Sequence, residues 1–353
     1  MTIPARVHFC WLGSSLPWAY VYAVLSAAQN SGIQQITLHH TDPLADDARL
    51  RALELCPLVR LSRLDPVACL TAAGRAVGAG DGLVAIYRTL DNPAIRADVL
   101  RVAILYLEGG VYLDLDTVTR APLVPLLEAR HFVASERVIW PHFVRGWHTP
   151  ALWCRSLALD LSRKTMRRAP RGWEMFRWLE GFCYRAVTNA AMGAEANSRL
   201  CALYLRAMAA MAPQRRAQLY ALGPDLLQEL VDQYPKDELT VAEPEVFCPL
   251  PPQISEHWFR VSRSVRLSAA LRPQTRVVHW YASVRTRPKV AAMDPQYVCK
   301  LREHQLYSAL VYSCVRGLPD LARACAEPEF RGPQAAELSG ASSISRSDLQ
   351  RSP

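Results

Sequence analysis

The stretch that most constrains the fold is residues 109–116, which read Gly-Gly-Val-Tyr-Leu-Asp-Leu-Asp. The two glycines end a helix-like run and introduce a short apolar strand, which delivers Asp114 and Asp116 to its end. In open α/β folds, ligands bind at the carboxyl edge of the sheet, so acids at this place lie where a ligand would sit. Paired carboxylates suit a hard divalent cation, which usually comes with substrate phosphates. The run therefore predicts a metal-assisted reaction on a phosphorylated donor.

The surrounding sequence alternates between short apolar runs and helical patterns. Strands are expected at residues 7–12, 35–40, 59–61, 131–136 and 276–281, and helices at 18–31, 44–55 and 94–108. Such alternation is typical of a parallel α/β sheet. Residues 70–95 are rich in Gly and Ala and look irregular, whereas residues 150–211 are expected to be mostly helical.

Composition and charge indicate which broad class of protein this chain belongs to. With 353 residues, of which 50% are apolar and 21% charged, the chain is expected to be a soluble globular protein with a substantial core. The net charge of +9 permits attraction to nucleic acid, anionic lipid or phosphorylated ligands, but an arginine-rich composition explains it equally, and we expect no nucleic-acid partner.

The cysteines and the N-terminus indicate in which cellular compartment the protein is expected. The ten cysteines include no CxxC pair, which disfavours a zinc site and favours a reducing compartment. The N-terminus has no apolar signal-peptide core, and no apolar run approaches the ~20 residues of a membrane span. A cytoplasmic protein is expected. The basic, aromatic stretch at 163–178 predicts either peripheral contact with an anionic membrane or a solvated helix face.

An isolated Asp-x-Asp is a weak signal, because Asp is common in turns. Its context strengthens it: Asp98 and Arg101, three residues apart on one helical face, directly precede the Gly-Gly strand. Two other classes remain open at this point. A metal-dependent phosphohydrolase would need further acids and histidines near the pair, and the neighbouring sequence offers none. A non-enzymatic nucleotide or saccharide binder is the second.

The pattern Ala97-Asp98-x-x-Arg101 followed by residues 109–116 resembles the DXD sugar-binding glycosyltransferases, such as fungal initiating mannosyltransferases and the glucosyltransferase domains of large clostridial toxins. Weaker similarities lie at residues 3–13, 188–194, 222–227 and 278–283. The resemblance implies a GT-A fold, a Rossmann-like mixed sheet flanked by helices. It implies a single catalytic domain over 1–330, with a nucleotide-sugar half at 1–125 and an acceptor half at 126–330. Residues 331–353 are Ser-, Gly- and Pro-rich and are expected to be a disordered tail.

The same resemblance implies a bacterial-type retaining hexosyltransferase. It would use Mn²⁺ or Mg²⁺ and a nucleotide-sugar donor, with a UDP-sugar favoured over a GDP-sugar. By position, Asp116 would be the main metal ligand and His279 the second. Asp114 would contact the ribose and the sugar, reaching the metal directly or through water. The remaining donor contacts would be Trp11 on the nucleobase, Tyr112 near the ribose, Asp98 and Arg101 on the sugar hydroxyls and the diphosphate side, and Ser283 on the diphosphate.

Each of these residues has a structural alternative. Trp11 and Tyr112 fit the core, His279 fits a satisfied core histidine, and Asp98 with Arg101 fits a surface ion pair worth tenths of a kcal/mol. The acceptor stays open between a polysaccharide, a glycolipid or other lipid-linked saccharide, and a protein hydroxyl, and a secreted effector is a further possibility. The segment around Asn189 departs from the pattern of the family, so acceptor contacts cannot be carried over.

Overall fold

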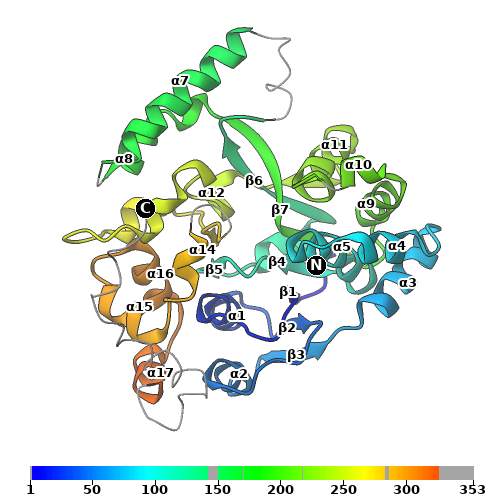
Figure 1. Ribbon diagram of the computed structural model, residues 1–353, viewed down its shortest axis with the longest axis horizontal. Coiled ribbons are helices and arrows are strands. Elements are labelled where there is room, and N and C mark those ends of the chain that lie inside the picture. Colours follow the sequence, from blue (N-terminus) through cyan, green and yellow to red (C-terminus); the bar gives the residue numbers. More distant parts are fainter. Residues whose placement is uncertain (1, 142–149, 170, 217, 283–285, 326–353) are drawn as a thin grey trace, which may run out of the picture.

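The computed structural model describes residues 2–141, 150–169, 171–216, 218–282 and 286–325 (Figure 1). Its centre is a seven-stranded sheet with the strand order β3-β2-β1-β4-β7-β6-β8, and a second sheet pairs β5 with β9. The strands of the large sheet are β1 (Arg6–Trp11), β2 (Gln35–His40), β3 (Val59–Arg63), β4 (Gly110–Leu113), β6 (His131–Val138), β7 (Tyr184–Ala194) and β8 (Leu239–Val241). The small sheet consists of β5 (Thr117–Thr119) and β9 (Val277–His279).

The large sheet is mixed. Strands β3, β2, β1 and β4 run parallel to one another, while β7 runs antiparallel to both of its neighbours, β4 and β6. The four parallel strands lie next to one another at one side of the sheet, and β7 joins them to β6 and β8. The predicted α/β class is confirmed, and the sheet is mixed and flanked by helices, as the resemblance implied.

Helices cover both faces of the sheet, and successive residues of a strand point to opposite faces. In β1, Phe9 belongs to one apolar core and Cys10 to the other. The core that contains Cys10 is formed largely by α3 (Pro66–Val77), α4 (Gly82–Thr89), α5 (Pro93–Glu108), α9 (Arg199–Ala210) and α11 (Leu226–Gln233). The core that contains Phe9 is formed largely by α1 (Trp18–Asn30), α12 (Pro244–Phe247), η4 (Pro252–Phe259), α15 (Pro295–Leu301) and α16 (Leu306–Cys314).

The remaining helices are short or lie at the periphery. In Figure 1, α7 and α8 lie at the periphery, beside the ends of β6 and β7, and buried residues of both helices belong to the core that contains Phe9. These remaining helices are α2 (Ala48–Glu54), η1 (Val124–Glu128), α7 (Pro150–Met166), α8 (Gly172–Phe176), η2 (Glu180–Phe182), α10 (Pro213–Arg216), η3 (Ala221–Asp225), α13 (Leu267–Ala270), α14 (Arg287–Val290) and α17 (Leu318–Ala324). None of the helices within the described residues has the length and apolar character that a membrane span requires.

The junction between α5 and β4 positions the acid pair. The side chain of Asn92 caps α5 by accepting a hydrogen bond from the Ala94 N–H at 2.9 Å, and the helix ends at Gly109. Gly109 and Gly110 both have positive φ, at 64° and 109°, which L side chains rarely adopt. A Cβ on Gly110 would also lie 2.8 Å from the Arg6 carbonyl oxygen. The two glycines therefore allow the chain to reverse closely against β1 and enter β4.

One expectation about secondary structure was wrong, and another missed a strand. Residues 70–95 are not irregular but include most of α3 and all of α4. Asp65 caps α3 by accepting from the Val67 N–H at 2.8 Å. Helix α3 packs on both α4 and α5, and a Cβ on Gly74 would lie 2.3 Å from the Gly80 carbonyl oxygen. Gly78 and Gly80 have positive φ and belong to the short turn between α3 and α4.

Residues 150–211 are helical only in part, because β7 crosses the middle of the sheet between β4 and β6. Its sequence contains few β-branched residues, which weakens the local strand signal. The structure supplies the reason: a Cβ on Gly193 would lie 2.1 Å from the Phe132 ring. Close side-chain packing against this buried strand thus selects small residues. The expected tail at 331–353 lies outside the described residues, and the division into two halves stays a prediction.

Candidate functional site

The site forms where β4 ends and the small sheet begins. Asp114 directly follows β4, and Asp116 directly precedes β5. Strand β5 pairs antiparallel with β9, with Thr117 opposite His279. This pairing brings the His279 Nε2 atom to 3.2 Å from Asp116 Oδ1. Asp114, Asp116 and His279 each offer one ligand atom, and these atoms lie within 4.8 Å of one another. The structure therefore brings the three predicted metal ligands together.

Asp116 is held in place by the backbone that follows β9. The Ala282 N–H donates to Asp116 Oδ2 at 2.7 Å, and the Trp280 N–H donates to the Asp116 carbonyl at 3.0 Å. Burial alone would raise the pKa of Asp116, but His279 and the Ala282 N–H hold that pKa below its usual value. Burial opposes the charged form of His279, yet Asp116 raises the pKa of the imidazole well above its usual value. In the absence of metal the two side chains therefore form an ion pair.

Arg101 connects the acids of the site. It extends from α5, and its NH1 atom donates to Asp114 Oδ2 at 3.2 Å. Its NH2 atom lies 3.0 Å from Asp114 Oδ1 and 3.1 Å from Asp98 Oδ1. Its NH1 atom donates to the Asn189 carbonyl at 2.6 Å. The guanidinium lies 4.8 Å over the Tyr112 ring, and the residue is only 5% exposed. The alternative of a surface ion pair is therefore wrong, because Arg101 is a buried link between two carboxylates.

Asp98 is the meeting point of three segments. The Asn189 side-chain amide, from β7, donates to Asp98 Oδ1 at 2.8 Å. Gly223, in η3, comes so close that a Cβ there would lie 2.8 Å from Asp98 Oδ2. Burial raises the pKa of Asp98, and it raises that of Asp114 to about 6 although Arg101 opposes the shift. The two carboxylates are thus fixed in a site of low dielectric, where their fields act strongly on a bound ligand.

The other predicted donor contacts are placed as follows. Trp11 ends β1 and is partly buried, with its ring centroid 5.3 Å from that of Tyr20. Tyr112 is 1% exposed, and its ring packs against the guanidinium of Arg101. Ser283 lies outside the described residues. Contacts of these residues with a nucleobase, a ribose and a diphosphate stay predictions.

The structure adds residues that the sequence did not single out. The Tyr281 hydroxyl donates to Glu136 Oε2 at 2.8 Å, and the Tyr281 ring centroid lies 3.9 Å from that of His279. Glu136, Cys248 and His279 also offer ligand atoms within 4.8 Å of one another. A signal for Glu136 was available, because it is an acid at the end of a predicted strand, as Asp114 is. The neighbouring sequence had offered no further acid, and β6 supplies one.

Residues 81–133 match the model of the family described as "Glycosyltransferase sugar-binding region containing DXD motif". The matched segment contains Asp98, Arg101 and the acid pair, which supplies its Asp-x-Asp. A search of curated proteins gave no match.

Three solved structures that are similar to this chain are described as glycosyltransferases. The PaToxG glycosyltransferase has 14% identity and a TM-score of 0.41, over 65% of this chain and 69% of that one. The UDP-bound glycosyltransferase domain of the YGT toxin has 11% identity and a TM-score of 0.37, over 68% and 80%. Mouse xyloside xylosyltransferase 1 has 11% identity and a TM-score of 0.42, over 78% and 98%.

Proposed function

We propose that this chain, a glycosyltransferase by its DXD-containing sugar-binding region, transfers a sugar from a nucleotide-sugar donor to a hydroxyl acceptor with retention of configuration. We further propose that the reaction depends on a divalent metal and that the donor is a UDP-sugar rather than a GDP-sugar. The observation that carries the proposal is the convergence of Asp114, Asp116 and His279, whose ligand atoms lie within 4.8 Å of one another.

The chemistry of these three side chains fits a divalent cation. Carboxylates suit both Mg²⁺ and Mn²⁺, whereas Mg²⁺ prefers oxygen ligands and retains several waters. An imidazole beside two carboxylates therefore favours Mn²⁺. His279 must be neutral to bind a metal, so binding would displace the proton that it shares with Asp116. The Ala282 N–H would keep Asp116 oriented in both states.

A metal bound here would supply positive charge to the diphosphate leaving group. The rest of the catalytic work falls to the chain itself. Asp98 would orient the donor sugar through its hydroxyls and stabilise positive charge as the sugar becomes oxocarbenium-like. Arg101 would hold Asp98 and Asp114 in one geometry and favour their charged forms, because it lies within 3.2 Å of both carboxylates. The burial of Arg101 makes this a positioning role.

The acceptor and the compartment are further proposals based on the sequence. We propose a saccharide hydroxyl as acceptor, free or lipid-linked, with a protein hydroxyl as the second candidate, and a cytoplasmic enzyme. Peripheral membrane contact through residues 163–178 stays a prediction. Retention of the protein on anionic vesicles at low salt tests it.

The test of the proposed reaction is release of UDP from a panel of UDP-sugars, measured with and without Mn²⁺. Release should require Mn²⁺, and Asp116→Asn should reduce it by roughly a hundredfold or more, the size typical for losing a group that stabilises transition-state charge. Asp46→Asn is the matched control, because Asp46 is exposed and its carboxylate pairs with a surface arginine, Arg51, at 3.5 Å. Metal-independent release, or equal release by both variants, would contradict the proposal.

A further inference from the structure

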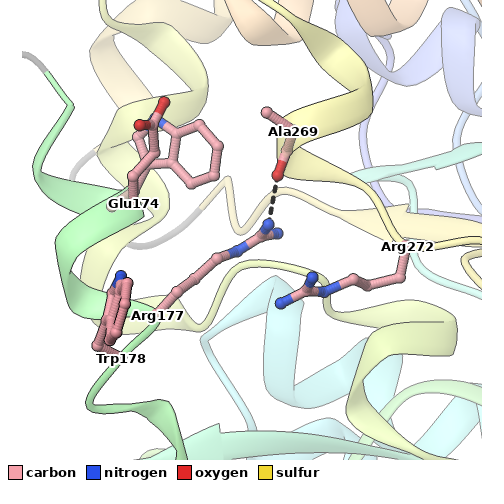
Figure 2. A pocket seen from close by; sticks show the side chains of 6 residues that line it. Glu174, Arg177, Trp178, Ala269 and Arg272 are labelled. Atoms are coloured by element: carbon pink, nitrogen blue, oxygen red, sulfur yellow. Dashed lines mark hydrogen bonds between the residues drawn. The ribbon is translucent and has the colours of Figure 1, made fainter.

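A second candidate binding site lies away from the acid pair, beside α8. It is an open pocket of about 420 Å³ between α8 with the residues after it and the segment that contains α13 (Figure 2). Its volume lies within the range of small-molecule sites. The lining residues are Trp173, Glu174, Arg177, Trp178, Ala269 and Arg272.

Two guanidinium groups enter this pocket from opposite walls (Figure 2). Arg177 lies 4.9 Å over the Trp173 ring and donates to the carbonyls of Ala269 and Ala270, which fixes its orientation. Its buried Nε has no hydrogen-bond partner. Burial lowers the pKa of Arg177, and the nearby charge of Arg272 lowers that pKa further. The two like charges are therefore close enough to repel each other.

Three acids, Glu174, Glu180 and Glu245, act on Arg177 electrostatically, but within the described residues none of them forms an ion pair with Arg177 or Arg272. Glu174 lines the pocket and pairs with Arg171 at 4.0 Å, and Glu245 pairs with Arg137. Burial raises the pKa of the Glu180 carboxyl, although the neighbouring arginines oppose the shift. Within the described ranges, neither a carboxylate nor any other acceptor is found bonded to the Arg272 side chain. Two guanidinium groups that face one pocket without a carboxylate bonded between them suit an oxyanion ligand, because a guanidinium binds oxyanions in a bidentate manner.

Trp178 supplies the second half of the site. Its side chain is 86% exposed, the largest value among the exposed large apolar residues of the described chain. An indole left in water at the rim of a pocket is a typical sign of a binding surface, since burying it on a ligand would be favourable. Its flat face suits the apolar face of a sugar ring. The pocket therefore combines an oxyanion site with a stacking surface.

We propose that this pocket binds a saccharide that carries an anionic group, a phosphate or a carboxylate. Arg177 and Arg272 hold the oxyanion and Trp178 stacks on the ring. Both walls are joined along the chain to strands of the donor site: the α8 wall is followed by η2 and by β7, which carries Asn189, and Arg272 precedes β9, which carries His279. On the proposed function, the bound saccharide is the acceptor or an extension of it. Its role as acceptor rests on the proposed function, whereas its binding does not.

The test is calorimetric titration with a hexose phosphate, a uronic acid, the neutral hexose, inorganic phosphate and anionic vesicles. Saturating UDP and Mn²⁺ are present throughout to fill the donor site. A hexose phosphate or a uronic acid should bind at least tenfold more tightly than the neutral hexose and than inorganic phosphate, a ratio that corresponds to about 1.4 kcal/mol. Arg272→Gln should weaken this binding about tenfold or more, and Trp178→Ala should weaken it several-fold. Arg266→Gln is the matched control, because Arg266 is exposed in the same segment and does not line the pocket.

Equal binding of the neutral hexose or of inorganic phosphate would overturn the proposal. An equal loss in Arg266→Gln would do the same, as would retention on vesicles without saccharide binding. The titration is repeated in Asp116→Asn, which should bind the anionic saccharide normally even though it cannot turn over donor. Failure of the pocket is therefore distinguishable from failure of the proposed reaction.

Discussion

Replacement of Arg101 by alanine should destabilise the protein strongly before any ligand is added. Arg101 lies within 3.2 Å of two carboxylates, those of Asp98 and Asp114, in a site where its own side chain is 6% exposed. Removing one partner of a buried ion pair costs about 3–5 kcal/mol, because a charge remains buried without compensation. Whole domains are stable by only about 5–15 kcal/mol, so this loss is a large fraction of the total. Arg101→Lys should lose less, about 1.5–3 kcal/mol for each charge-assisted hydrogen bond that the single amine cannot make.

The assay is equilibrium urea unfolding at neutral pH, without metal or donor. Arg6→Ala is the control, because Arg6 pairs with Glu108 at 3.7 Å on the surface and its loss should cost less than about 1 kcal/mol. Without Arg101, the pKa values of Asp98 and Asp114 should rise further in the folded protein. An acid with a raised folded-state pKa favours the fold at low pH, and this contribution is lost as the pH rises. The deficit of Arg101→Ala should thus be smaller at pH 5 than at pH 8. The reasoning is refuted if Arg101→Ala costs no more than Arg6→Ala.

Two other predictions concern different parts of the fold. Gly223→Ala places a Cβ 2.8 Å from Asp98 Oδ2 and should lower donor turnover several-fold. Gly181→Ala is the control, because a Cβ there meets nothing within 4 Å and turnover should not change. Equal turnover in both variants would exclude close packing at Gly223 as a determinant of the site. Burial lowers the pKa of His8 to about 4 and of His39 to about 3, so both stay neutral in the fold but take up protons in the unfolded chain below pH ~6.5. The free energy of unfolding should therefore fall as the pH drops from 6.5 to 4, by up to about 3 kcal/mol for each histidine. Urea unfolding of His39→Gln should show a smaller fall in stability over this pH range than the unchanged protein. An unchanged pH dependence in the variant would contradict the assignment.

The fold could be predicted where the local pattern and the packing favour the same element. The Gly-Gly turn, strand β4 and its acid pair all follow from neighbouring residues, and the spacing of Asp98 and Arg101 places them on one helical face. Strand β7 could not be predicted in this way. Its small residues are required by side chains from distant segments, such as Phe132 against Gly193, and local propensity gives no sign of such contacts.

In the candidate site, too, the contacts that could not be predicted are those between residues far apart in the sequence. His279 reaches Asp116 only because β9 pairs with β5 across nearly half of the chain, and resemblance to a family was the only guide to it. That Arg101 is a buried link rather than a surface partner also depends on long-range contacts, since Asn189 arrives from β7. Glu136 joins His279 through Tyr281, a contact that no sequence pattern indicates.

The most direct measurement of the central claim is anomalous diffraction from crystals soaked with Mn²⁺ and UDP. The account predicts a manganese peak bound to Asp116, with Asp114 and His279 bound to it directly or through one water, at metal–ligand distances of about 2.0–2.3 Å. The peak should disappear in Asp116→Asn crystals, while the contacts of Arg101 with Asp98 and Asp114 persist. A manganese ion bound elsewhere, or one that stays in place in Asp116→Asn, would contradict the account.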